Sequence, residues 1–145
     1  MTDIIADEKE TPQIYLITPS EIDLVTFPDT LARCLDAVDI ACVRLSLGAT
    51  DDTYIAKSAD ALRVITHDRD VALVIDSHVL MVERLGLDGV HLSDAARTLK
   101  AVRKDLGADA ISGTNCYASR NNGMTACELG ADYISFGPVG ETNLG

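Results

Sequence analysis

Short apolar runs alternate with longer amphipathic runs from Gln13 onward, and this alternation constrains the fold of the chain more than any other feature. The short runs are nearly continuous in apolar residues, as expected of strands that are buried on both faces. The longer runs place apolar side chains three and four positions apart, which is the spacing of an amphipathic helix. The order of the runs predicts βα units around a parallel sheet.

The pattern predicts six strands and five helices. We expect strands over residues 14–18, 42–47, 71–76, 89–92, 110–113 and 133–136. We expect helices over residues 29–38, 53–67, 78–85, 94–106 and 119–129. Side chains that can cap a helix precede the second, fourth and fifth helices: Asp51, Asp52 or Thr53, then Ser93 or Asp94, then Ser119. Glycines that can end a helix follow three of them: Gly86, Gly107 and Gly130.

Such a series of units can be wound as an open sheet or closed as an eight-fold barrel. The first strand runs into Pro19, Ser20 and Glu21 with no GxGxxG, so a dinucleotide-binding fold loses its main support. We therefore expect an α/β fold of the TIM (β/α)8 type, with about six βα units visible in this chain.

We expect residues 1–11 to form a flexible acidic tail, because they hold few side chains able to anchor them to a core. Residues 12–145 are expected to form one βα-repeat barrel domain that lacks the last two βα units of an eight-fold barrel. An open barrel leaves two unpaired strand edges. These edges can be covered in three ways: by residues beyond this sequence, by a rearrangement of the fold, or by a homo-oligomer.

The formal net charge of −11 excludes long-range attraction to nucleic acid and to anionic lipid. An anionic small substrate must then be captured by local donors or by a bridging cation, which favours a metal ion. The N-terminus lacks a basic region followed by an apolar run, and no stretch approaches the roughly 20 apolar residues that span a bilayer. We expect a cytoplasmic protein with no membrane partner.

The stretch GADYISFGPVGET, residues 130–142, joins a predicted strand to a turn rich in Gly and Pro. Glycines let the main chain approach an anion closely, and N–H groups in such a turn form a concave donor surface. The turn therefore predicts a phosphate site with contacts at Gly137, Gly140 and Thr142. The alternative is an ordinary strand that ends in a tight turn.

The segments LGLDGVHLSD (residues 85–94) and LGADYISFGPVGET (residues 129–142) resemble thiamine phosphate synthase and its thiazole tautomerase relatives. The run IYLIT near the start and ALVIDSHV at residues 72–79 support this resemblance in the family's order. It implies a (β/α)8 barrel that joins a pyrimidine-methyl diphosphate to a thiazole phosphate, releasing diphosphate with the help of Mg²⁺. Metal and donors would stabilise the departing diphosphate electrostatically.

The resemblance implies a site in which Arg44, Asp76 and His91 are catalytic. Arg44 replaces a longer basic run of the family and is expected to face the barrel mouth and bind phosphate, with an ion pair to an acid such as Asp76 as the alternative. His91 matches the histidine of the family's GVHL strand; a structural histidine is the alternative.

The metal ligands implied by the resemblance are altered in this chain. Asp76 and Ser77 stand where the family has an Asn-Asp pair, so Asp76 becomes the candidate ligand and Ser77 a candidate substrate contact. Asp94 is the second candidate ligand, with a helix N-cap as the alternative. Cys116 and Tyr117 stand near the position of the tautomerase base, where nothing in the local sequence supplies a cation to lower a pKa.

Three functions stay open on the sequence. The first is an enzyme of the thiamine phosphate synthase type. The second is a diverged, non-catalytic or differently specific relative that binds a phosphorylated thiazole or another small phosphate, as the loss of expected acids and cations suggests. The third is a structural or interaction role, motivated by the two βα units that we expect to be lacking.

Overall fold

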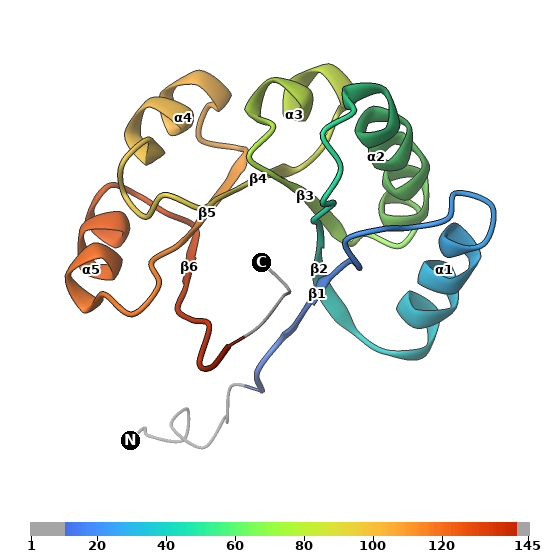
Figure 1. Ribbon diagram of the computed structural model, residues 1–145, viewed down its shortest axis with the longest axis horizontal. Coiled ribbons are helices and arrows are strands. Elements are labelled where there is room, and N and C mark those ends of the chain that lie inside the picture. The colour runs from blue at the N-terminus through green and yellow to red at the C-terminus, as the bar shows by residue number, and fades with distance from the viewer. Residues whose placement is uncertain (1–10, 142–145) are drawn as a thin grey trace, which may run out of the picture.

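Residues 11–141 are described by the computed structural model, in which one parallel sheet carries helices on its outer face (Figure 1). The strands are β1 (Ile14–Ile17), β2 (Ile40–Leu45), β3 (Ala72–Asp76), β4 (Gly89–Leu92), β5 (Ile111–Asn115) and β6 (Tyr133–Ser135). The helices are α1 (Phe27–Ala37), α2 (Asp52–His67), α3 (Val79–Leu85), α4 (Leu99–Leu106) and α5 (Arg120–Glu128). All the strands and helices expected from the alternation are present. The expected acidic tail, by contrast, lies almost wholly outside the described residues.

The sheet keeps its strands in chain order, β1-β2-β3-β4-β5-β6, and every neighbouring pair is parallel. It curls into an arch with β1 and β6 at its two edges and α1 to α5 around the outside (Figure 1). The described chain is thus a curled TIM-like half-barrel. No helix within residues 11–141 is long and apolar enough to cross a membrane.

Alternation along the strands divides the side chains between two environments. Val43, Leu45, Leu73 and Ile75 belong to the core between the sheet and the helices, where they join helix residues such as Leu62. Each such side chain contributes about 1.5–3 kcal/mol to folding by its removal from water. The alternate positions face the concave side of the arch and carry the polar groups described below.

Several helix ends follow the local signals in the sequence. Asp51 caps α2 by accepting a hydrogen bond from the Thr53 N–H, and Ser119 caps α5 by accepting from the Asn122 N–H. Gly86 follows α3 in the left-handed conformation, with φ of 68°. These caps satisfy backbone groups that each helix end leaves unpaired.

The start of α4 differs from the prediction, because this helix begins at Leu99 and not at residue 94. Ala95 has a φ of 55°, which no helix accommodates, and its carbonyl accepts a hydrogen bond of 2.7 Å from the Thr114 hydroxyl. The end of β5 therefore holds residues 93–98 in a turn. The predicted capping of this helix by Ser93 or Asp94 is wrong, since its N-cap residue is Thr98.

Strand β5 is also longer than expected and ends at Asn115 instead of residue 113. Thr114 and Asn115 are polar, but they pair with Ile134 and Ser135 of β6. Pairing with β6 extends β5 two residues further toward the mouth of the arch. The polar composition of these two residues does not reveal this pairing.

Candidate functional site

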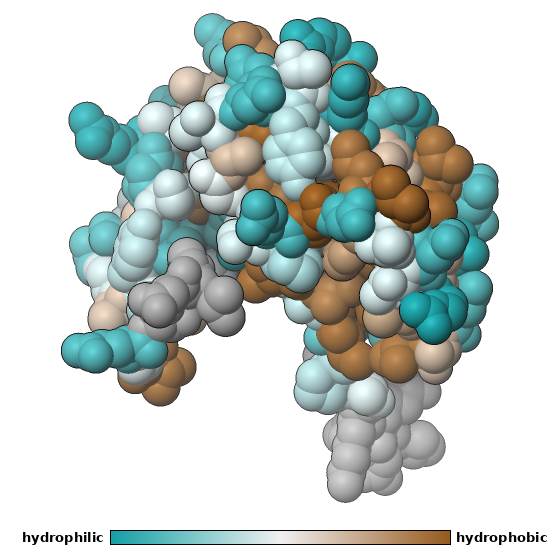
Figure 2. Space-filling model, turned by 45° about the vertical axis from the view of Figure 1, so that its right-hand side comes forward, coloured by the Kyte–Doolittle hydropathy of each residue, from teal (hydrophilic) through white to brown (hydrophobic). Residues whose placement is uncertain are grey.

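A cavity of about 1100 Å³ occupies the concave side of the arch. The space-filling view shows the hollow between the two ends of the molecule (Figure 2). Its polar lining includes Arg44, Asp76, Ser77, His91, Asn115 and Tyr133, which come from β2 to β6 and the loop after β3. Ligand sites of parallel α/β folds commonly lie where the carboxyl ends of strands converge. The cavity is thus the candidate site.

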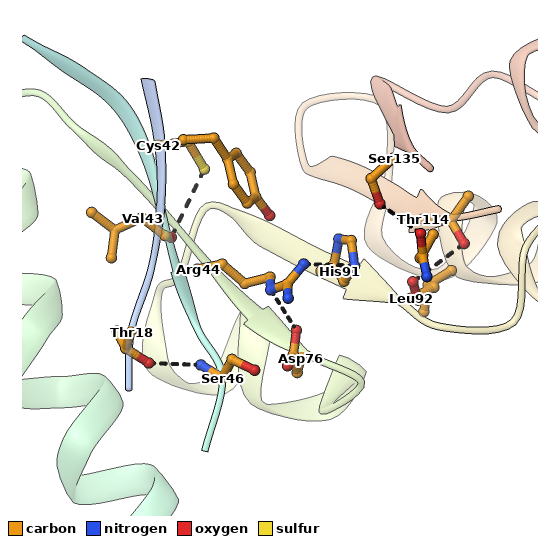
Figure 3. Close-up of polar contacts among 12 residues, drawn as sticks. Thr18, Cys42, Val43, Arg44, Ser46, Asp76, His91, Leu92, Thr114 and Ser135 are labelled. Atoms are coloured by element: carbon orange, nitrogen blue, oxygen red, sulfur yellow. Dashed lines mark hydrogen bonds and ion pairs between the residues drawn. The ribbon is translucent and has the colours of Figure 1, made fainter. Parts of the chain in front are cut away.

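Arg44 lies on β2 and is 8% exposed, with its guanidinium at the centre of the polar contacts (Figure 3). Its Nε lies 3.1 Å from Oδ1 of Asp76, and its Nη1 lies 2.9 Å from Nε2 of His91. The contact with Asp76 is a charge pair without hydrogen-bond alignment. The ion pair considered as an alternative for Arg44 is therefore present, and among residues 11–141 Nη2 makes no hydrogen bond.

His91 lies on β4 and is 5% exposed. Its Nδ1 lies 2.8 Å from the hydroxyl of Tyr133, so both ring nitrogens have a partner. Burial, together with the positive charge of Arg44, lowers the pKa of His91 to about 4. The imidazole is consequently neutral at neutral pH.

Two tyrosines join the edge strands across the concave side. The hydroxyl of Tyr15 on β1 lies 2.5 Å from that of Tyr133 on β6, and the ring centroids are 5.2 Å apart. Burial raises the pKa of Tyr15 to about 12 and raises the pKa of Tyr133 as well. Both hydroxyls therefore stay protonated and can donate hydrogen bonds. The guanidinium of Arg44 lies 6.0 Å from the centre of the Tyr15 ring.

Asp76 is the last residue of β3, and its side chain is 32% exposed. Burial raises the pKa of this carboxyl, while the Ser46 side chain and Arg44 act in the opposite direction. Ser77 follows with a φ of 60°, an uncommon conformation for a residue with a Cβ. The Ser77 N–H donates to the His91 carbonyl oxygen, which holds this turn against β4.

The β5 and β6 ends supply further polar groups to the cavity. The hydroxyl of Ser135 donates to Oδ1 of Asn115 at 3.0 Å. Gly137 lines the cavity, but its N–H donates to the Tyr117 carbonyl oxygen at 3.1 Å. Gly140 is exposed and does not line the cavity, while Thr142 lies outside the described residues.

The two candidate metal ligands are placed differently. Asp76 lines the cavity, whereas Asp94 does not. One oxygen of Asp94 accepts a hydrogen bond of 2.8 Å from the Thr98 hydroxyl, and the other is buried without a partner in the described chain. Within residues 11–141 no cluster of three or more His, Cys, Asp or Glu side chains could hold a metal ion.

Cys116 and Tyr117, which the resemblance places near the tautomerase base, directly follow β5. Cys116 is fully buried, and burial raises the pKa of its thiol. The hydroxyl of Tyr117 donates to the carbonyl oxygen of Ser93 at 2.6 Å, which ties the loop after β4 to the loop after β5. Burial thus disfavours the thiolate form of Cys116.

Four functional candidates were missed by the sequence reasoning: Tyr15, Tyr133, Asn115 and Ser135. Tyr15 and Tyr133 stand within apolar runs and were read as ordinary strand residues. A signal was available, because Tyr133 and Ser135 occupy alternate positions in one strand and so share the concave face. Neither run by itself indicates that the side chains of Tyr15 and Tyr133 contact each other.

Residues 14–144 match the family described as thiamine monophosphate synthase. A thiamine-phosphate synthase of Rhodospirillum centenum is 42% identical over 125 residues, which cover 86% of this chain and 60% of that protein. One of Erythrobacter litoralis is 37% identical, with 90% of this chain and 62% of that protein covered.

A solved structure of thiamine phosphate pyrophosphorylase from Pyrococcus furiosus has a similar fold. The TM-score is 0.73 at 19% identity, with 91% of this chain and 63% of that chain covered. This similarity supports the TIM-like arrangement of the strands and helices. The chain spans about 60% of the length of the curated relatives that it matches.

Proposed function

The chain belongs to the thiamine monophosphate synthase family, and on this premise we propose that its cavity takes part in thiamine phosphate synthesis. The proposed reaction joins hydroxymethylpyrimidine diphosphate to a thiazole phosphate. The bond between the pyrimidine methylene carbon and the diphosphate oxygen breaks, and a bond from the thiazole nitrogen to that carbon forms. Diphosphate leaves with the electron pair of the broken bond.

The observation that carries this proposal is the position of Arg44. Its guanidinium is buried at the cavity between His91 and Asp76, and its Nη2 makes no hydrogen bond within residues 11–141. An arginine in such a place binds phosphate oxygens through charge-assisted hydrogen bonds, which are shorter and stronger than neutral ones. Arg44 would thereby attract the diphosphate despite the net charge of −11 and stabilise it as it leaves.

Asp76 fits the Mg²⁺ that the family in general uses. This cation is commonly held by one or two carboxylates together with substrate phosphates and waters, so one partly exposed carboxylate at the cavity suits it. Bound there, the metal would neutralise charge on the departing diphosphate. Asp94 stays a second candidate ligand, although it does not line the cavity.

Ser77 and the turn after β6 are proposed to contact the substrates. Ser77 lies beside Asp76 and would donate its hydroxyl to a phosphate or to the pyrimidine. The turn that contains Gly137, Gly140 and Thr142 is proposed to bind phosphate. The lining of the cavity by Gly137 supports this role, and since its N–H is already used by Tyr117, the later residues of the turn would supply the donors.

A coupling assay on folded full-length chain tests the proposal. The two substrates are mixed with the protein with and without Mg²⁺, and thiamine phosphate is measured. Metal-dependent product supports the synthase activity. Binding of either substrate without turnover would instead support the alternative, a diverged and non-catalytic relative. If neither substrate binds, the cavity is not the substrate site.

The variant Asp76→Ala tests the metal site within the same assay. We expect it to abolish the dependence on Mg²⁺, because the carboxylate at the cavity is lost. Asp60→Ala is the matched control, since Asp60 pairs with Arg63 on the outer surface of α2. An unchanged magnesium response in Asp76→Ala would remove Asp76 as a ligand.

A further inference from the structure

Three neighbouring strands place His91, Gly113 and Tyr133 in one row. In the sheet register His91 of β4 is opposite Gly113 of β5, which in turn is opposite Tyr133 of β6. Side chains in one such row point to the same face of the sheet. A side chain at position 113 would therefore stand between those of His91 and Tyr133.

Gly113 leaves that space to the ring of Tyr133. A Cβ at position 113 would lie 2.0 Å from an atom of this ring, which is far inside van der Waals contact. The Tyr133 ring thus extends across β5 toward β4, where its plane is within 16° of the His91 ring plane and its hydroxyl lies 2.8 Å from Nδ1. The contact between Tyr133 and His91 depends on the absence of a side chain between them.

The partners of His91 determine its tautomer. A guanidinium has donors and no acceptor, so Nε2 of His91 must accept the hydrogen bond from Nη1 of Arg44. In a neutral imidazole the proton then resides on Nδ1, which donates to the Tyr133 hydroxyl oxygen. The opposite tautomer would face a donor of Arg44 with another donor at 2.9 Å.

We propose that Tyr133, extended across Gly113, is a positioning residue that fixes the orientation of the His91 ring by accepting from its Nδ1–H and thereby orients Arg44 for binding diphosphate. The role of Arg44 in this statement rests on the proposed function. Tyr133 touches neither substrate nor metal in this scheme. Tyr15 supports it from β1 through the hydroxyl contact with Tyr133.

The tautomer can be observed directly by ¹⁵N nuclear magnetic resonance of the histidine side chains in the full-length chain. The sequence has three histidines, and the signals of His91 are assigned by their loss in His91→Gln. We expect Nδ1 to carry the proton in the unmodified chain, with the downfield shift of a hydrogen-bonded N–H, and we expect this shift to be lost in Tyr133→Phe. A proton on Nε2 in the unmodified chain, or an unchanged Nδ1–H signal in Tyr133→Phe, overturns the proposal.

Affinity for inorganic diphosphate, measured by calorimetry, tests the effect on Arg44. Tyr133→Phe keeps the ring and loses the hydroxyl, so we expect affinity to fall about 5-fold, as for the loss of one net hydrogen bond. Gly113→Ala should act in the same direction by displacing the ring. Equal affinity in the unmodified chain and folded Tyr133→Phe would overturn the proposal, whether or not Gly113→Ala folds.

Tyr54→Phe is the matched control for a lost tyrosine hydroxyl. The hydroxyl of Tyr54 bonds with the backbone of Ile22 and has no contact with His91. We expect neither the Nδ1–H signal of His91 nor the affinity for diphosphate to change. Changes equal to those of Tyr133→Phe would show a general structural effect and overturn the positioning role.

His91→Gln separates positioning from packing. A glutamine side-chain oxygen accepts from Arg44 without any choice of tautomer. In this background, Tyr133→Phe should change diphosphate affinity less than 2-fold; the same 5-fold loss would contradict the proposal. The resonance result does not depend on turnover, so loss of the hydrogen-bonded Nδ1–H signal in Tyr133→Phe, in a chain with no coupling activity, would reject the proposed function and leave the positioning role standing.

Discussion

Strands β4 and β6 begin alike and end differently. Each follows a helix and a short segment, Leu85-Gly86-Leu87-Asp88 before β4 and Leu129-Gly130-Ala131-Asp132 before β6. Both glycines have positive φ, 68° and 92°. Oδ2 of Asp88 accepts from the Leu73 N–H at 2.7 Å, and Oδ2 of Asp132 accepts from the Ser112 N–H at 2.8 Å.

Each of these aspartates also meets a cationic or imidazole side chain from an outer helix. His67 of α2 lies 3.1 Å from Asp88, and Arg103 of α4 lies 2.9 Å from Asp132. The repeated segment therefore joins the start of each strand to the preceding strand and to a helix. Its role is structural, as is common at the amino-terminal face of such barrels.

Strands β4 and β6 themselves differ, although the segments before them are alike. β4 is paired on both sides and is buried throughout, and it carries His91. β6 is an edge of the described sheet with half-buried residues, and it carries Tyr133 and Ser135. The comparison shows that stability devices recur at the amino ends of the strands, while groups for chemistry differ from strand to strand toward the carboxyl ends.

Arg44→Ala should produce the largest effect at the carboxyl ends. We expect affinity for diphosphate to fall at least about 100-fold, because truncation of a buried, hydrogen-bonded charge that meets an oppositely charged ligand costs several kcal/mol. Calorimetry measures the loss. Arg63→Ala removes a surface arginine paired with Asp60 and serves as the control. An unchanged affinity in Arg44→Ala would contradict the placement of the diphosphate site at the carboxyl ends of the strands.

The pH dependence of the free energy of unfolding should distinguish His91 of β4 from Tyr133 of β6. The pKa of His91 is about 4 in the folded chain and near 6.5 when unfolded, so the unfolded state binds more protons between these values. The stability from neutral His91 is full above pH 6.5 and is lost as pH falls toward 4, by about 3 kcal/mol. Tyr133 contributes nothing in this range.

The measurement is urea unfolding at several pH values, compared with His91→Gln. The variant should lose this part of the pH dependence, although other groups keep theirs. An equal slope in both proteins would show that His91 is not the group responsible.

Asp88→Ala and Asp132→Ala test the repeated segment. Each change leaves a backbone N–H of the sheet without its acceptor, and we expect the free energy of unfolding to fall by about 1.5 kcal/mol for Asp88 and about 1 kcal/mol for Asp132 at the edge. Affinity for diphosphate should not change in either. If either variant lost as much affinity as Arg44→Ala, the amino ends of the strands would have a role in binding and not only in stability.

Ser135→Ala should have the smallest effect. It removes one hydrogen bond to Asn115 at a half-buried edge, so affinity for the proposed substrates should change only about 2-fold. Parallel binding titrations with the unmodified chain measure this difference. A loss of 20-fold or more would give β6 a direct role in binding that the comparison does not assign to it.

Much of the fold and part of the site were predictable from local sequence. Apolar periodicity predicted all the strands and helices of residues 11–141, and glycine or capping residues marked many of their ends. The resemblance to thiamine phosphate synthase, and not periodicity, named Arg44, Asp76 and His91 as one site, and the structure brings these three side chains together. Their separation in sequence was no obstacle, because parallel strands present corresponding positions to one face.

The tertiary structure decided what depends on neighbours distant in sequence. The start of α4 moved because Thr114 binds the Ala95 carbonyl oxygen, and Tyr15 met Tyr133 although 118 residues separate them. Periodicity is a property of one segment, so the sequence by itself determined the elements and the faces on which their side chains lie. The curl of the sheet determined which side chains on the concave face meet, since hydrogen bonds form only at distances that packing of all the strands sets.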